Sequence, residues 1–202
     1  MVALGVGLAV AAAGLAWLAG RQTQAGLRGI PPDHPRHLVP FHLTERDGQT
    51  RSEADLAGKI LVVDFVFTSC SLSCRVVNDR MEEIQRLLAG APDVRLLSLT
   101  VDPRTDTPRV LTAFAASFHA DPATWWFLTG EKTELYRLLD TSFLSRSDDP
   151  TQLIPGGFNG TDRIMLVDAA GDVRASFDGL QPRVAADIAV EVARLRSHPP
   201  SR

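Results

Sequence analysis

Two cysteines, Cys70 and Cys74, are the residues of this sequence whose type and spacing most directly predict chemistry. The chain contains no other cysteine, and three residues separate the two. A pair this close is typical of a redox-active dithiol or of a metal-binding pair. A thiolate is both the nucleophile of disulfide exchange and a ligand for soft metal ions, so both chemistries stay open. The plainer alternative is two small buried residues in a turn.

The segments on either side of the cysteines predict where the pair lies. Residues 59–67 form a continuous apolar run, which favours a strand buried on both faces. Residues 77–88 carry apolar side chains at helical spacing. Cys70 would lie in the loop between them and Cys74 about one turn later, where helix N–H groups stabilise a thiolate. Arg75 adds a positive charge next to Cys74.

The other patterns predict an α/β fold. Short strands are expected at 41–44 and 125–128, a buried strand at 94–101, and a hairpin from 163–167 to 173–177. Helices are expected from Pro108, with Thr107 as N-cap, to about Phe118, and at 131–139 and 182–195. This order matches a thioredoxin-like fold, a central mixed sheet flanked by helices, with one helix-containing insertion.

The loop that follows the strand at 94–101 should lie at the same edge of the sheet as the cysteines. Ligands of open α/β sheets bind beyond the carboxyl ends of the strands, and Asp102 and Asp106 fall there. We interpret these two residues as part of a turn and of the cap of the next helix.

Length and composition limit the function classes. The chain has 202 residues, 45% hydrophobic and 22% charged, which fits one domain with short appendages. The formal net charge of −3 gives no basic excess for nucleic acid. Two cysteines also exclude a scaffold that depends on many disulfides.

The N-terminal part has a different composition. Residues 1–20 contain no charged side chain, and a helix of this length spans about 30 Å, enough for the core of a bilayer. We expect a transmembrane anchor or an uncleaved signal, and the absence of Lys and Arg before the run favours the anchor. Residues 21–37 predict a proline-rich linker, 38–197 the thioredoxin-like domain and 198–202 a tail.

Several motifs, in this order, resemble the Sco/SenC family over nearly the whole domain. They are F-V-F-T-S-C-S-L-S-C, L-S-L-T-V-D-P-R-T-D-T-P, W-W-F-L-T-G and R-I-M-L-V-D-A-A-G. The resemblance implies that Cys70 and Cys74 bind copper as a metallochaperone site. It also implies delivery of copper to the binuclear site of cytochrome c oxidase subunit II, or reduction of the cysteines of that site. A single membrane anchor, with the domain facing the periplasm or an equivalent extracytoplasmic space, is usual in this family.

The sequence departs from the family at the third copper ligand. The family has a histidine eight residues before the aspartate of the L-V-D segment, and counting back from Asp168 gives Gly160. Asn159 and Asp162 are near this place, but oxygen ligands suit Cu(I) poorly. We interpret all five histidines as surface residues; they are His34, His37, His42, His119 and His198.

The missing histidine leaves three hypotheses. Two thiolates alone can hold Cu(I), so a copper-binding assembly factor stays the first. An extracytoplasmic thiol–disulfide oxidoreductase without stable copper binding is the second, which leaves open whether the chain is an enzyme. The third is a degenerate family member that binds a partner without using its thiols.

Overall fold

The computed structural model describes residues 35–70, 73–146, 158–159 and 161–197. The expected membrane segment at 1–20, residues 21–34 of the expected linker and the expected tail at 198–202 lie outside the described residues. Within the described ranges, no helix is both long and apolar enough to cross a bilayer.

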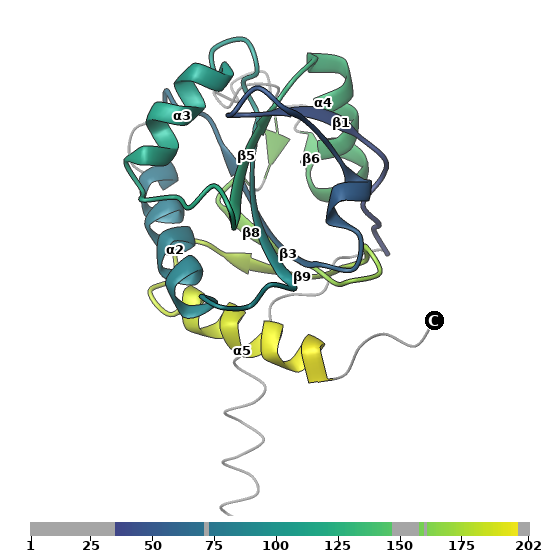
Figure 1. The fold of residues 1–202 in the computed structure, drawn as a ribbon, viewed down its shortest axis with the longest axis vertical. Helices are drawn as coiled ribbons and strands as arrows, with labels where there is room; N and C mark the ends of the chain where they lie inside the picture. Colours follow the sequence, from purple (N-terminus) through teal and green to yellow (C-terminus); the bar gives the residue numbers. More distant parts are fainter. Residues whose placement is uncertain (1–34, 71–72, 147–157, 160, 198–202) are drawn as a thin grey trace, which may run out of the picture.

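A mixed sheet forms the centre of the domain (Figure 1). Its order is β2-β1-β5-β4-β3-β8-β9. The parallel strands in the middle are β3 (Ile60–Val66), β4 (Val94–Thr100) and β5 (Trp125–Thr129). The antiparallel strands at the two sides are β1 (His42–Glu45), β2 (Thr50–Ser52), β8 (Arg163–Val167) and β9 (Val173–Asp178). The carboxyl ends of β3, β4 and β5 therefore meet at one edge.

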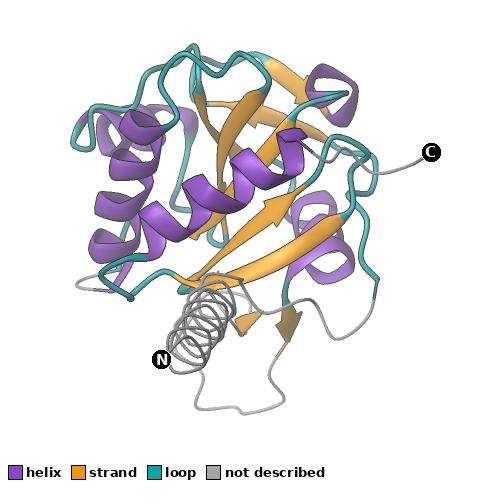
Figure 2. Cartoon of the chain, turned by 90° about the horizontal axis from the view of Figure 1, so that it is seen from below, coloured by secondary structure: helices purple, strands orange, loops and turns teal. Residues whose placement is uncertain are grey.

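Helices cover both faces of this sheet. Three of them, α2 (Ser73–Leu87), α3 (Pro108–Ala116) and α5 (Val184–Ser197), pack on one face, and α5 lies across it in Figure 2. The other face carries α4 (Lys132–Leu138), which continues into a short π-helix, η2 (Leu139–Phe143). Each face has its own hydrophobic cluster, so the sheet is buried on both sides.

Strand β3 shows why an unbroken apolar run folds as a central strand. Its side chains alternate between the two faces. Leu61 and Val63 point into the cluster beneath α4, and Ile60 and Val62 into the cluster beneath α2 and α5. Every residue of β3 is buried, so apolar side chains are needed at both phases of the alternation. Asp64 is the exception in this run.

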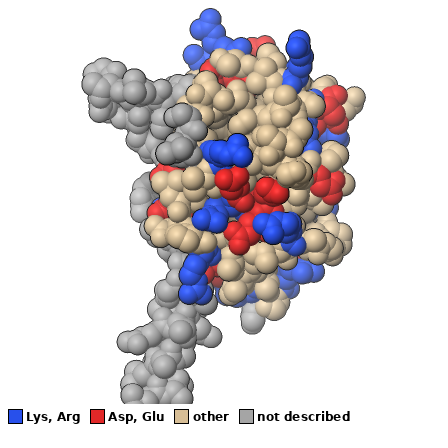
Figure 3. Space-filling view, turned by 90° about the vertical axis from the view of Figure 1, so that its left-hand side faces the viewer, with Lys and Arg blue, Asp and Glu red and all other residues tan. Residues whose placement is uncertain are grey.

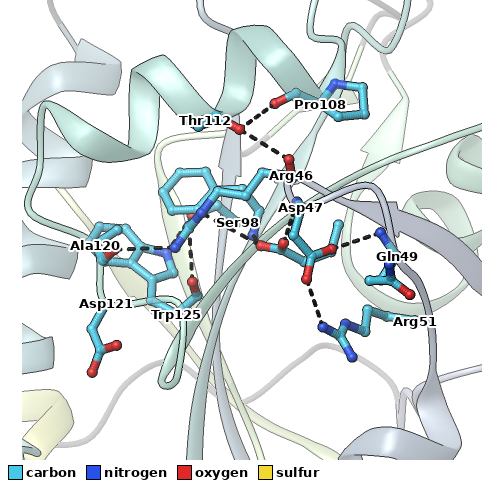
Figure 4. Close-up of polar contacts among 12 residues, drawn as sticks. Arg46, Asp47, Gln49, Arg51, Ser98, Pro108, Thr112, Ala120, Asp121 and Trp125 are labelled. Carbon is cyan, nitrogen blue, oxygen red and sulfur yellow. Dashed lines mark hydrogen bonds and ion pairs between the residues drawn. The ribbon is translucent and has the colours of Figure 1, made fainter.

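A hairpin of β1 and β2 is fixed to the amino end of β5 by a buried cation (Figure 4). The guanidinium of Arg46 donates to the carbonyl oxygens of Trp125, at 3.0 Å, and Ala120, at 3.2 Å. Thr112 of α3 donates to the carbonyl oxygen of Arg46 at 3.0 Å. Burial raises the pKa of neighbouring Glu45 and lowers that of Arg46. This cluster ties elements together at the edge opposite the cysteines.

The expected α/β class and the order of the main elements are confirmed. The structure adds short elements that the patterns did not predict: β2, the 3-10 helix η1 (Glu53–Leu56), the pair β6 (Ser145–Arg146) and β7 (Phe158–Asn159), and η2. Helix ends also differ from the expected bounds, most clearly in α3 and α5. Helix α3 ends at Ala116 rather than near Phe118, and α5 runs from Val184 to Ser197 rather than from 182 to 195.

Candidate functional site

The two cysteines are joined in a disulfide where β3 passes into α2. Their Cα atoms are 6.0 Å apart. Cys70 lies in the loop, where its N–H donates to the carbonyl oxygen of Phe67 at 3.0 Å. Cys74 lies in the first turn of α2, which begins at Ser73. The fold therefore brings the expected pair together at the carboxyl edge of the central strands.

The two cysteines differ in exposure. Cys74 is 6% exposed and belongs to the buried side of α2, with Val77 and Met81 on the same side. Cys70 is partly exposed. An incoming thiolate attacks along the line of the sulfur–sulfur bond, so access to one sulfur decides which of them reacts. Cys70 is accordingly the more exposed residue of the pair.

Arg75, the cation expected beside the pair, is exposed, and its side chain reaches Phe118, just beyond the end of α3. Its guanidinium carbon is 5.6 Å from the ring centroid of Phe118, a cation–π distance. Other charges on this side of the domain pair locally. Arg80 is 3.3 Å from Glu83, and His119 is 3.1 Å from Glu82. Figure 3, which views the side of α2 and α3, shows acidic and basic groups intermixed there.

A buried carboxyl group connects the cysteine loop to the end of β4. Asp106 is fully buried and accepts hydrogen bonds from the backbone N–H of Thr68, at 3.2 Å, and from the Thr68 hydroxyl. The hydroxyl of Thr100 donates to the second carboxyl oxygen of Asp106, Oδ2. The expected turn is present, because the N–H of Asp106 donates to the carbonyl oxygen of Asp102 at 2.9 Å. Thr107 caps α3 as expected, through Val110 N–H.

A second buried carboxyl group, Asp64, lies on the face of the sheet that α2 covers. It is completely buried, and burial raises its pKa to about 7. The Ser98 hydroxyl donates to its Oδ1 at 2.5 Å, and the indole N–H of Trp125 donates to the Ser98 oxygen at 2.8 Å. Its Oδ2 has no hydrogen-bond partner among the described residues.

The sequence patterns did not predict the interactions of these two carboxyl groups. Asp64 could have been found, because a single acid inside a strand buried on both faces must meet a polar partner. Asp106 was assigned only to a turn and cap, since its contact to Thr68 joins residues that are 38 positions apart.

No third metal ligand accompanies the cysteines in the part of the chain that the structure describes, where no group of three or more His, Cys, Asp and Glu side chains could hold a metal ion. His37, His42 and His119 are exposed and lie beside the carboxylates of Asp172, Glu134 and Glu82, in keeping with surface roles. His34, His198 and Gly160, where the family histidine is expected, lie outside the described residues. Asp162 lies just before β8, at the edge of the sheet where the cysteines lie. Its carbonyl oxygen accepts a hydrogen bond from Gly179 N–H at 2.9 Å.

The order of the sheet and a cysteine pair between a central strand and its helix define a thioredoxin-like protein with a paired dithiol. A family model for SCO1/SenC proteins matches residues 31–195, so the chain belongs to the SCO1/SenC family. This confirms the family expected from the motifs.

Individual relatives agree with this membership. The SCO1 protein homolog of Bacillus subtilis is 30% identical over 163 residues, which cover 77% of this chain and 80% of that protein. A second relative is BsSco, a member of the Sco family of cytochrome c oxidase assembly proteins, and a disulfide switch was identified in BsSco. Its solved structure is 27% identical to this chain, with a TM-score of 0.70, and the match covers 84% of this chain and 98% of that one. The copper-bound structure of Bradyrhizobium japonicum ScoI is 26% identical, with a TM-score of 0.63 and coverage of 77% and 97%.

Proposed function

We propose that this chain is a copper-binding assembly factor for the binuclear copper site of cytochrome c oxidase subunit II. Cu(I) would be its cargo, held by the thiolates of Cys70 and Cys74 in the reduced protein. The observation that carries the proposal is the direct bond between the two sulfurs, because side chains that close a disulfide can also approach one small ion from two sides. Cu(I) favours soft thiolate ligands, and a d10 ion accepts two-coordinate geometry.

The cellular setting of the proposal comes from residues 1–20 and from the family. This apolar segment would anchor the chain, and the domain would face an extracytoplasmic space. The related SCO1/SenC family protein of Bacillus anthracis, 27% identical with a TM-score of 0.69, is a lipoprotein, which is consistent with a domain held at a membrane surface.

A second candidate function is thiol–disulfide exchange with an extracytoplasmic dithiol partner. It needs only the two cysteines, and the described residues around the pair supply no third metal ligand. In this reaction the Cys70 thiolate attacks the partner's disulfide and forms a mixed disulfide, releasing one partner thiolate. The Cys74 thiolate then attacks Cys70, which releases the second partner thiolate and closes the disulfide of this chain. The exposure of the two residues fits these roles, because Cys70 is the more accessible.

Anaerobic titration of the reduced full chain with Cu(I), in competition with a chromophoric chelator, tests the first function. We expect one equivalent to bind tightly, and Cys70→Ser and Cys74→Ser each to abolish that binding, since each removes one of two ligands. Ser69→Ala, which changes the exposed neighbour of Cys70, should bind as the unaltered chain does. We also expect weak binding of Cu(II), which prefers imidazole nitrogen.

Two outcomes would contradict the first function. If the unaltered chain does not bind Cu(I) tightly but exchanges rapidly with a dithiol buffer, the second function is supported and the first is not. In that case Cys74→Ser should accumulate a mixed disulfide through Cys70. Full function of both cysteine variants in cells would instead support a protein that binds its partner without its thiols.

A further inference from the structure

The side chain of Asp106 joins two loops at the functional edge, and it does not cap the helix that it precedes. The cap of α3 is the hydroxyl of Thr107. The Asp106 carboxyl group turns instead toward Thr68, two residues before Cys70. A purely local turn needs only the backbone bond from Asp106 to Asp102, so the buried carboxyl group has a further role.

Both oxygens of Asp106 are used as acceptors, and all the donors come from the ends of β3 and β4. Thr68 supplies its N–H and its hydroxyl, and Thr100 supplies its hydroxyl. Thr100 is itself fixed, because its oxygen accepts from Asp102 N–H at 2.9 Å. The N–H of Val101 donates to the carbonyl oxygen of Val66 at 2.8 Å, just below this network. The segment that enters the cysteine loop is thus attached to the sheet edge at two points, Val66 and Thr68.

This attachment bears directly on how the sulfurs meet. Cys74 is held by α2, which packs on the sheet, whereas Cys70 depends on its loop for its position. The chance that two thiols react with each other rises when neither has to be brought into place. A loop released at Thr68 would let Cys70 occupy more positions in the reduced state, and closure of the disulfide would become less favourable.

We propose that Asp106 is a positioning residue for the dithiol: its buried carboxyl group holds the Thr68 segment so that Cys70 stays within reach of Cys74. The inference rests on the proposed function of the pair and deepens it, because the same placement serves closure of a disulfide and capture of a two-coordinate metal ion. Asp106 touches neither the metal nor a partner in this role.

The test is the equilibrium of the full chain with reduced and oxidised dithiothreitol, with the fraction of disulfide read by thiol alkylation. Asp106→Asn keeps the size of the side chain but replaces one acceptor oxygen with an NH2 group that faces a donor. We expect its equilibrium constant for disulfide formation to fall about tenfold, which is a potential about 30 mV less negative. Thr68→Val, which removes the hydroxyl but keeps the N–H, should move the constant in the same direction and by less.

Thr107→Ala is the matched control. It removes the cap of the adjacent helix, and it should lower the melting temperature while leaving the equilibrium constant unchanged within twofold. The proposal is overturned if Asp106→Asn stays within twofold of the unaltered chain, or if Thr107→Ala moves the constant as far. Should Asp106→Asn fail to fold, an unchanged constant in folded Thr68→Val overturns it as well. The measurement contains no copper, so failure of Cu(I) binding would refute the proposed cargo and leave this test intact.

Discussion

Among single residues, Asp64 places an ionisable group at the centre of a hydrophobic cluster. Its neighbours in that position are the Ser98 hydroxyl and, through it, the indole of Trp125, and neither carries a charge. Removal from water disfavours the charged carboxylate more than one hydroxyl donor favours it, so its pKa rises from 3.8 to about 7. The folded protein thus keeps a proton on Asp64 at pH values where the unfolded chain has lost it.

The stability of the domain should therefore fall as the pH rises from about 4 to about 7, and level off above that range. Between these values the folded state binds more protons than the unfolded state, so the free energy of unfolding decreases with pH, by roughly 4 kcal/mol at most for this group. Asp64→Asn, neutral at every pH, should remove this decrease and be the more stable form at pH 8. Urea unfolding of the oxidised chain at pH 5 and at pH 8 measures both effects.

The exposed Asp79 on α2 provides the control for that measurement, since Asp79→Asn should keep the pH dependence of the unaltered chain. An Asp64→Asn variant whose stability still fell between pH 5 and pH 8 would show that other groups cause the decrease.

The cysteine pair could be predicted from the sequence, whereas the partners of the buried carboxyl groups depend on tertiary contacts and could not. Cys70 and Cys74 could be paired from sequence because four positions separate them, a distance that one loop and one helical turn can close. Ser98, the partner of Asp64, lies 34 residues away, and Thr68, one of the two partners of Asp106, lies 38 residues away. Only the register of β3 beside β4, which aligns Asp64 with Ser98, reveals such contacts.

Among the elements, the turn between β9 and α5 fits closely against the start of β8. A Cβ atom at Gly179 would lie 2.7 Å from the carbonyl oxygen of Asp162 and 3.0 Å from a methyl carbon of Val77 in α2. The carbonyl oxygen cannot move freely, because it accepts the hydrogen bond of Gly179 N–H. A side chain here would push apart α2, β8 and β9 next to the dithiol.

Gly179→Ala should consequently destabilise the domain by about 1–3 kcal/mol, the usual cost of forcing atoms into a filled space. Gly130→Ala is the matched substitution, because the Cβ there would meet the end of the flexible Leu43 side chain at 2.9 Å. Leu43 can adjust more easily than a bonded backbone group, so Gly130→Ala should cost less. Denaturant midpoints of the two variants decide this, and equal losses would contradict the assignment of Gly179 as a close-packing position.

The long elements could be predicted and the short ones could not. Strands β3 and β4 have seven residues each and are mainly apolar, and α3 carries a capping threonine followed by proline, so each has a strong local signal. Strand β2 has three polar residues, and β6 and β7 have two residues each. Such segments are strands only because a partner strand lies beside them, which no local pattern records.

For the whole molecule, the two-sided core means that folding depends little on the disulfide. Hydrophobic clusters fill both faces of the sheet and join the central strands to α2, α3, α4 and α5. The disulfide closes a loop of only four residues in sequence separation, and the entropy that so short a loop removes from the unfolded chain is small. A core that does not depend on this bond allows the bond to open and close, as the proposed function requires.

Reduction should accordingly lower the melting temperature without unfolding the domain. The chain-entropy relation gives about 2 kcal/mol for a loop of this size, which corresponds to a decrease of roughly 4–8 °C for a domain of about 160 residues. Calorimetry of the full chain with and without dithiothreitol measures the decrease, and Cys70→Ser/Cys74→Ser should melt near the reduced form and not respond to the reductant. Cooperative melting of the reduced form near its oxidised value would fit a chain that cycles between the two states in its work, whereas loss of folding on reduction would show that the sheet and its helices need the bond to stay together.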